Sequence, residues 1–101
     1  MTIWNVAPVT EDPEIFLVSW KVMETKEGTR HFVGYNVSNK EGRVSSAIET
    51  FDKEHMTGIT SSGRVYKLKG PSISNSDADY VWGRWRLIND IKEYKDVSDS
   101  I

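Results

Sequence analysis

Apolar and polar residues alternate most regularly between Glu14 and Met23, and this alternation predicts a β-strand. Successive side chains of a strand point to opposite faces of its sheet. One face of this strand is wholly apolar and is the predicted core face: Phe16, Val18, Trp20 and Val22. Gly28 suits the positive φ of a hairpin loop, so we expect the chain to turn there and return as a second strand.

Shorter segments downstream have the same character and are separated by two turns that contain glycine, 38–42 and 61–63, and by a loop over residues 52–57. The predicted strands cover residues 30–37, 43–51, 58–60 and 64–68. On the first of these, the expected inner face carries His31, Val33, Tyr35 and Val37. The stretch from Ser46 to His55 also fits a short helix, but its β-branched residues favour the strand. Thr2–Val6 alternates as well and is a candidate edge strand.

The periodicity changes to that of a helix after the last predicted strand. Apolar residues then recur at spacings of three and four and form one stripe: Ala78, Val81, Trp82, Trp85 and Ile88. Ser76 followed by Asp79 resembles a capping box, so the helix should begin there and run to about Tyr94. Gly83 lies inside it, and we expect the missing side chain to let the sheet approach closely. The polar tail 95–101 should fray.

The order of these elements indicates the fold class. Strands come first along the chain and one helix comes last. This order predicts an α+β fold, in which an antiparallel sheet of about four to five strands packs against one C-terminal helix. A length of 101 residues is typical of one domain, so we assign residues 1–101 to a single α+β domain.

Composition excludes several kinds of active site. The chain has no cysteine, which removes disulfides, thiolate nucleophiles and thiolate metal ligands. It also lacks the G-x-S-x-G elbow and the P-loop. Of its two histidines, we expect His31 to be a half-buried sheet residue and His55 to lie in a solvated loop, 52–55, that does not hold a cation. We therefore predict a protein that is not an enzyme and has no cofactor and no metal site.

The predicted helix offers the best candidate for a binding surface. Tyr80 lies four residues before Arg84, so the two side chains share a face, and Leu87 continues it. Tyrosine and arginine are enriched in protein interfaces. We expect a protein partner at this face or at the open edge of the sheet, where two copies of the chain can also pair as a homodimer. The alternative is that Arg84 only pairs with an acid.

Two further hypotheses do not involve a protein partner. Arg43, Arg64 and Lys67 lie on predicted strands and form one basic patch for the phosphates of a nucleic acid if those strands are adjacent. The net charge of −2 argues against a general nucleic-acid-binding protein. The other hypothesis is a small ligand, bound among aromatic side chains between the sheet and the helix.

The first residues of the chain have neither a basic segment nor an apolar core, and so do not resemble a signal peptide. The longest apolar run, Ile15–Val18, is far shorter than the roughly 20 residues that span a bilayer. We therefore expect a cytoplasmic protein that does not contact a membrane.

Four short segments form a pattern that covers the middle and the helix of the chain. They are residues 31–35, 42–48, 62–66 and 79–82, which read HFVGY, GRVSSAI, SGRVY and DYVW. This pattern resembles small uncharacterised accessory proteins of mobile genetic elements, namely phages, plasmids and integrative elements. The resemblance implies an accessory protein that acts on a host or rival system, and it carries no catalytic residues.

Overall fold

The computed structural model describes residues 14–100. In this range the chain forms seven strands, one α-helix and one short 3₁₀-helix. In chain order they are β1 (Glu14–Thr25), β2 (Arg30–Asn36), β3 (Glu41–Val44), β4 (Ile48–Asp52), β5 (Thr57–Thr60), β6 (Val65–Leu68), α1 (Ser76–Ile88), β7 (Tyr94–Asp96) and η1 (Ser98–Ser100). The candidate strand Thr2–Val6 lies outside the described residues.

The strands form one mixed sheet in the order β3-β2-β1-β6-β5-β4, and β7 also pairs with β1. Paired strands are antiparallel except β1 and β6, which run parallel with Leu17 opposite Leu68. The α+β class is therefore confirmed, whereas the prediction of a wholly antiparallel sheet with four to five strands is wrong. β1 is long enough to pair with β6 near its start and with β7 near its end. Side-chain alternation does not encode which strand becomes the partner, or its direction.

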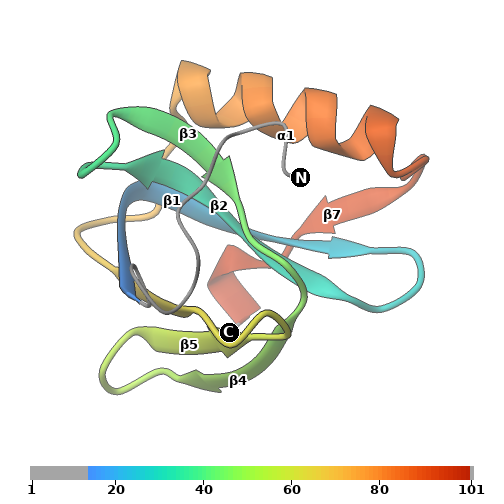
Figure 1. The fold of residues 1–101 in the computed structure, drawn as a ribbon. Coiled ribbons are helices and arrows are strands. Elements are labelled where there is room, and N and C mark those ends of the chain that lie inside the picture. Colours follow the sequence, from blue (N-terminus) through green and yellow to red (C-terminus); the bar gives the residue numbers. More distant parts are fainter. Residues whose placement is uncertain (1–13, 101) are drawn as a thin grey trace.

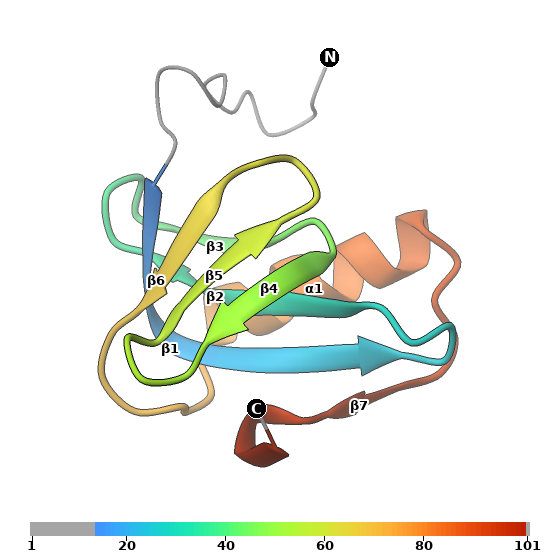
Figure 2. The same cartoon turned by 90° about the horizontal axis from the view of Figure 1, so that it is seen from below.

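Two layers of apolar side chains hold the fold together. α1 lies across β2 and β3 (Figure 1), and the space beneath it is filled by Met23, Val33, Ala78 and Trp82. On the opposite face, β4 and β5 fold back across β1 and β2 (Figure 2), and β4 contacts β2. The larger core lies between these two halves of the sheet and contains Ile15, Leu17, Trp20, Val22, Phe32, Tyr66, Leu68 and Val97.

β2 is covered on both faces as a result. Phe32 is fully buried in the larger core, while Val33 is buried beneath α1. The predicted inner face of this strand is therefore only half right. His31 and Val33 do face the interior, but Val37 is 48% exposed and the main core receives the opposite side of the strand.

A bulge in β1 reverses the predicted core face of its first half. Ser19 has a φ of 48°, and the register with β2 slips by one residue between positions 18 and 21. Leu17 is buried before the bulge and Trp20 after it. The bulge is fixed by the indole of Trp20, whose Nε1 donates to the carbonyl of Gly70 at 2.9 Å. The predicted core face is right at Trp20 and Val22 but wrong at Phe16 and Val18.

The predicted strand 43–51 is in fact two strands, separated by a turn at residues 45–47. Ser45 is buried, and its backbone N–H donates to the carbonyl of Phe32 at 2.9 Å. Its hydroxyl accepts from the Phe32 N–H at 2.8 Å. This pairing ends β3 beside β2, and the chain then crosses to begin β4 in the other half of the sheet. The strand alternative for 46–55 is confirmed over Ile48–Asp52, and no helix forms there.

The helix is shorter than predicted at its C-terminal end. Its N-cap is Asn75, one residue before the predicted cap, and the Asn75 side chain accepts from the Ala78 N–H at 3.0 Å. Asp90 has a φ of 56°, and the next N–H, from Ile91, donates to the carbonyl of Arg86 at 2.7 Å. This is a Schellman-type stop without its usual glycine. The residues that follow form β7 and η1 instead of further helix or a frayed tail.

The helix contacts the sheet through a narrower stripe than predicted. Ala78 and Trp82 are buried, but Ile88 is 60% exposed. Gly83 does not mediate the close approach, because a Cβ added there meets nothing within 4 Å. The close approach occurs at Gly42 of β3, where an added Cβ lies 2.8 Å from the backbone nitrogen of Ala78.

Candidate functional site

The outer face of α1 is formed by the three residues that the sequence predicts for partner binding. Tyr80 is 69% exposed, Leu87 is 71% exposed, and Arg84 between them is also exposed. Within residues 14–100, none of these three side chains makes a hydrogen bond or an ion pair. Ile88 extends the apolar surface at the C-terminal end of the helix. We call these four residues the helix face.

The three predicted phosphate contacts do not form an exposed basic patch. Arg64 is only 6% exposed, so it cannot contribute to a surface. Arg43 donates from Nε to the phenol oxygen of Tyr66 at 2.8 Å, and its guanidinium lies 5.7 Å from that ring. Lys67 is close to a carboxylate of Glu14, at 3.6 Å. The patch prediction is wrong because one of its members is buried and the other two already have partners within the fold.

A smaller basic and aromatic surface lies around Phe16. The bulge in β1 places this ring outside the core, where the ammonium groups of Lys67 and Lys69 lie 5.8 and 5.5 Å from its centroid. Each contact is within the range of a cation–π interaction. Strand alternation alone could not identify this surface, because it assigns Phe16 to the interior.

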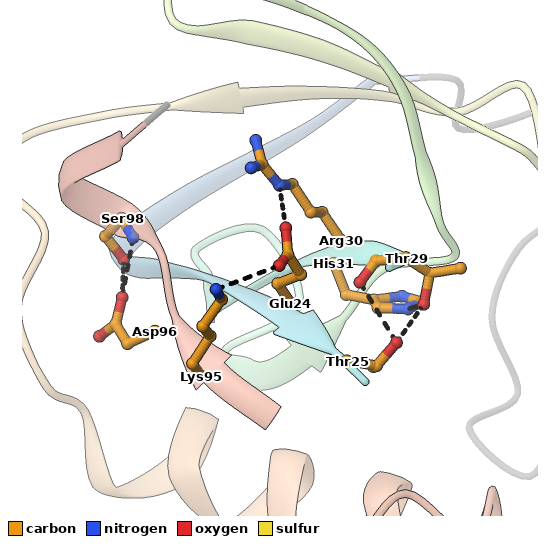
Figure 3. Close-up of polar contacts among 8 residues, drawn as sticks. All are labelled: Glu24, Thr25, Thr29, Arg30, His31, Lys95, Asp96 and Ser98. Atoms are coloured by element: carbon orange, nitrogen blue, oxygen red, sulfur yellow. Dashed lines mark hydrogen bonds and ion pairs between the residues drawn. The ribbon is translucent and has the colours of Figure 1, made fainter. Parts of the chain in front are cut away.

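His31 belongs to a closed polar network near the β1–β2 hairpin (Figure 3) and is 5% exposed. Its Nδ1 lies 2.9 Å from the carbonyl of Ser45, which can only accept, so Nδ1 carries the proton. Nε2 then accepts from the Thr29 hydroxyl at 3.0 Å, and that hydroxyl lies 2.7 Å from the Thr25 hydroxyl. The imidazole also packs 4.6 Å from the ring of Trp85. Burial lowers the pKa of His31, and both ring nitrogens already have partners within the fold.

Beside this network, one carboxylate is shared by two cations (Figure 3). Arg30 donates from Nε to Glu24 at 2.8 Å, and Lys95 approaches the other oxygen of Glu24 at 3.6 Å. The hydrogen bond from Arg30 lowers the pKa of Glu24, so this carboxylate stays charged at neutral pH. The two terminal nitrogens of Arg30 point away from Glu24. They make no hydrogen bond or ion pair within the part of the chain that the structure describes.

Arg30 also borders a pocket of about 290 Å³ at the open side of the larger core. Among the described residues its lining is Val22, Arg30, Phe32, Ile48, Phe51, Lys53 and Ser100. We call this cavity the Arg30 pocket. A shallower groove of about 410 Å³ adjoins it and follows β4, which is an edge strand of the sheet. The sequence predicts neither cavity, because β2 and β4 meet only through the fold of the sheet.

Among residues 14–100, no three histidine, aspartate or glutamate residues group together in a way that could hold a metal ion. Asp52, the last residue of β4, accepts a hydrogen bond from the ring of His55 at 2.7 Å, and this hydrogen bond lowers the pKa of Asp52. This pair lies on the surface and has no third ligand among the described residues.

Comparisons with known proteins leave the function to be argued from geometry. No family model matches the chain, and neither a curated protein nor a solved structure matches it. Between residues 14 and 100, no helix has both the length and the apolar character needed to cross a bilayer.

Proposed function

We propose that this chain is a non-enzymatic accessory protein that binds a partner protein through the helix face. The observation that supports this function is a tyrosine, an arginine and a leucine side by side on α1, all exposed and without polar partners in the described structure. Tyrosine and arginine are enriched among the residues that dominate protein interfaces, whereas leucine is not and contributes here through its exposed apolar area. Within the fold, none of the three is needed to fill a core.

The helix face is presented on a fixed support. The opposite side of α1 is anchored by Ala78 and Trp82, which are 2% and 4% exposed. The helix backbone is therefore already ordered before a partner binds. This reduces the entropic cost of association. Removing a leucine side chain from water contributes roughly 1.5–3 kcal/mol. Leu87 and Tyr80 together can therefore provide much of the affinity.

The chemistry of the helix face defines the partner surface. Arg84 lies between two apolar side chains, so the complementary surface is apolar and carries a carboxylate at its centre. The resemblance to accessory proteins of mobile elements suggests a host protein as the partner and inhibition or modulation as the outcome.

The proposal is tested with affinity capture from a host lysate, with and without nuclease, followed by a binding measurement on the purified partner. We expect a stoichiometric protein that survives nuclease treatment. The double variant Tyr80→Ala/Leu87→Ala should weaken its binding by at least about tenfold. The matched control is Val37→Ala/Ile59→Ala, because these side chains are 48% and 43% exposed but lie away from α1.

Circular dichroism must show that both double variants remain folded. Capture that disappears with nuclease would favour the nucleic-acid hypothesis instead. A partner that binds wild type and the Tyr80/Leu87 variant equally well would rule out the helix face. Equal weakening by both double variants would point to a general loss of apolar surface.

A further inference from the structure

We infer that the Arg30 pocket binds a small organic carboxylate with an apolar body. This site is separate from the helix face and does not depend on the proposed function. It combines an apolar lining, whose solvent-facing part is formed by the partly buried Ile48 and Phe51, with two cations that have hydrogen-bond donors without a partner among residues 14–100.

The floor of the pocket belongs to the larger core. Val22 and Phe32 are fully buried, and the partly buried Ile48 and Phe51 pack against the same cluster. The rings of Phe32 and Phe51 lie 5.9 Å apart and form an aromatic wall. The volume of about 290 Å³ is at the lower limit of the roughly 300–1,000 Å³ typical of small-molecule sites. An apolar body of one ring or a short alkyl chain fits such a space.

The rim holds a preoriented guanidinium. Glu24 accepts from the Nε of Arg30 at 2.8 Å and so fixes the plane of the group (Figure 3). The two terminal nitrogens have no partner among residues 14–100, and because Arg30 lines the pocket, their parallel N–H donors are available to a ligand there. A carboxylate matches this edge with two parallel hydrogen bonds, the geometry in which arginine recognises carboxylates best. Lys53, which also has no ion-pair partner in that range, lines the same pocket and supplies a second cation.

The charge around the pocket favours an anion. Glu24 is already shared between Arg30 and Lys95, so it does not neutralise both. Lys53 adds a further positive charge, and the pocket lining in the described structure contains no carboxylate. Glu49 borders only the adjoining groove along β4. An inorganic anion would leave the exposed parts of Ile48 and Phe51 in water, and an uncharged hydrocarbon would leave the cations unused, so the preferred ligand has both parts.

The probe that tests this inference is 3-phenylpropionate, compared with its neutral amide, 3-phenylpropanamide, and with acetate. Binding is followed by amide chemical shifts of the ¹⁵N-labelled full chain. We expect saturable binding of 3-phenylpropionate with Kd on the order of 0.1–1 mM, which is usual for a ligand of this size. The largest shifts should lie at Phe32, Ile48 and Phe51. The amide and acetate should each bind at least about tenfold more weakly.

Variants of Arg30 and Lys53 then measure how much each cation contributes to the affinity for 3-phenylpropionate. Arg30→Gln should weaken 3-phenylpropionate by about tenfold or more, the usual loss for a charge-assisted hydrogen bond. Because that change also frees Glu24, Lys53→Gln is the second variant, and it should weaken binding by a few fold. Lys92→Gln removes the same charge from the exposed connection between α1 and β7 and should leave Kd unchanged.

Five results would overturn the inference. The first four are equal affinity for the carboxylate and its amide, shifts that map away from the pocket, unchanged affinity in both the Arg30 and Lys53 variants, and no saturable binding. The fifth is tighter binding of an acidic, apolar peptide with shifts along the whole of β4. That outcome would identify β4 as an edge for strand addition.

Discussion

Replacing Gly42 with alanine tests how directly β3 packs against α1. A Cβ at this position lies 2.6 Å from the carbonyl carbon of Asp77 and 2.8 Å from the nitrogen of Ala78. Both contacts are shorter than the 3.0 Å below which Cβ atoms essentially never approach other heavy atoms. The atoms in question are backbone atoms of the first turn of α1, so no side-chain rotation can relieve the overlap. Either the helix or the strand must move.

The loss in free energy of unfolding caused by Gly42→Ala can be estimated from the movement of the helix or the strand. Overpacking of this kind costs typically about 1–3 kcal/mol. A shift that opens a gap of roughly 0.5–1 Å also forfeits a quarter to a half of the dispersion energy of the contacts involved. Those contacts include Ala78 and Trp82, which are buried in the layer between helix and sheet. We therefore expect Gly42→Ala to reduce the free energy of unfolding by about 2–4 kcal/mol.

The assay is urea unfolding followed by tryptophan fluorescence, with the slope and midpoint fitted separately. The matched control is Gly83→Ala, since a Cβ on this helical glycine meets nothing within 4 Å. That change should stabilise the protein by up to about 1 kcal/mol, the difference between the two residues in a helix interior. A free energy of unfolding for Gly42→Ala that stays within about 0.5 kcal/mol of wild type would refute the close packing. A stabilising effect at both glycines would refute it as well.

Two further predictions concern the same layer. Trp82→Ala should reduce the free energy of unfolding by about 3–5 kcal/mol, because the Trp82 side chain is buried. Tyr80→Ala, on the exposed face, should change it by less than about 0.5 kcal/mol. Similar unfolding midpoints for the two variants would contradict the assignment of Trp82 to the buried face and Tyr80 to the exposed face. Burial lowers the pKa of His31, so the folded state binds this proton less readily than the unfolded state. Stability should therefore be fully present above the unfolded pKa of roughly 6.5 and decline as the pH falls through it, and His31→Gln should flatten that dependence. The pKa values of Glu24 and Asp52 are lowered by hydrogen bonds, so these carboxylates titrate below this pH range. If the stability of His31→Gln depends on pH as steeply as that of wild type, His31 is not the group responsible.

The sequence by itself determined the class of the fold and the existence of most of its elements. Apolar alternation identifies the strands, because a half-buried strand needs that period. Spacings of three and four identify α1 and separate the exposed Tyr80 and Leu87 from the buried Trp82. These features depend on neighbours within one element, and local periodicity reports them directly. For the same reason, the pattern of the chain alone is enough to place Tyr80, Arg84 and Leu87 on one outer face of the helix.

Tertiary structure decided everything that depends on contacts between distant segments. The bulge at Ser19 moves Phe16 to the surface, and a serine with positive φ has no sequence signature. The stop of α1 at a non-glycine residue, Asp90, leaves the tail free to return as β7 on the edge of β1.

The Arg30 pocket depends on distant contacts in the same way. It exists only because β4 folds back onto β2 and brings Phe51 against Phe32, which lies in a different strand. Arg30 turns its terminal nitrogens outward because Glu24, on the neighbouring strand, holds its Nε. Periodicity describes which side of an element is apolar, but it does not specify which element covers that side or leaves part of it open. That choice is made by the packing of the whole chain, and here it decides where a ligand can bind.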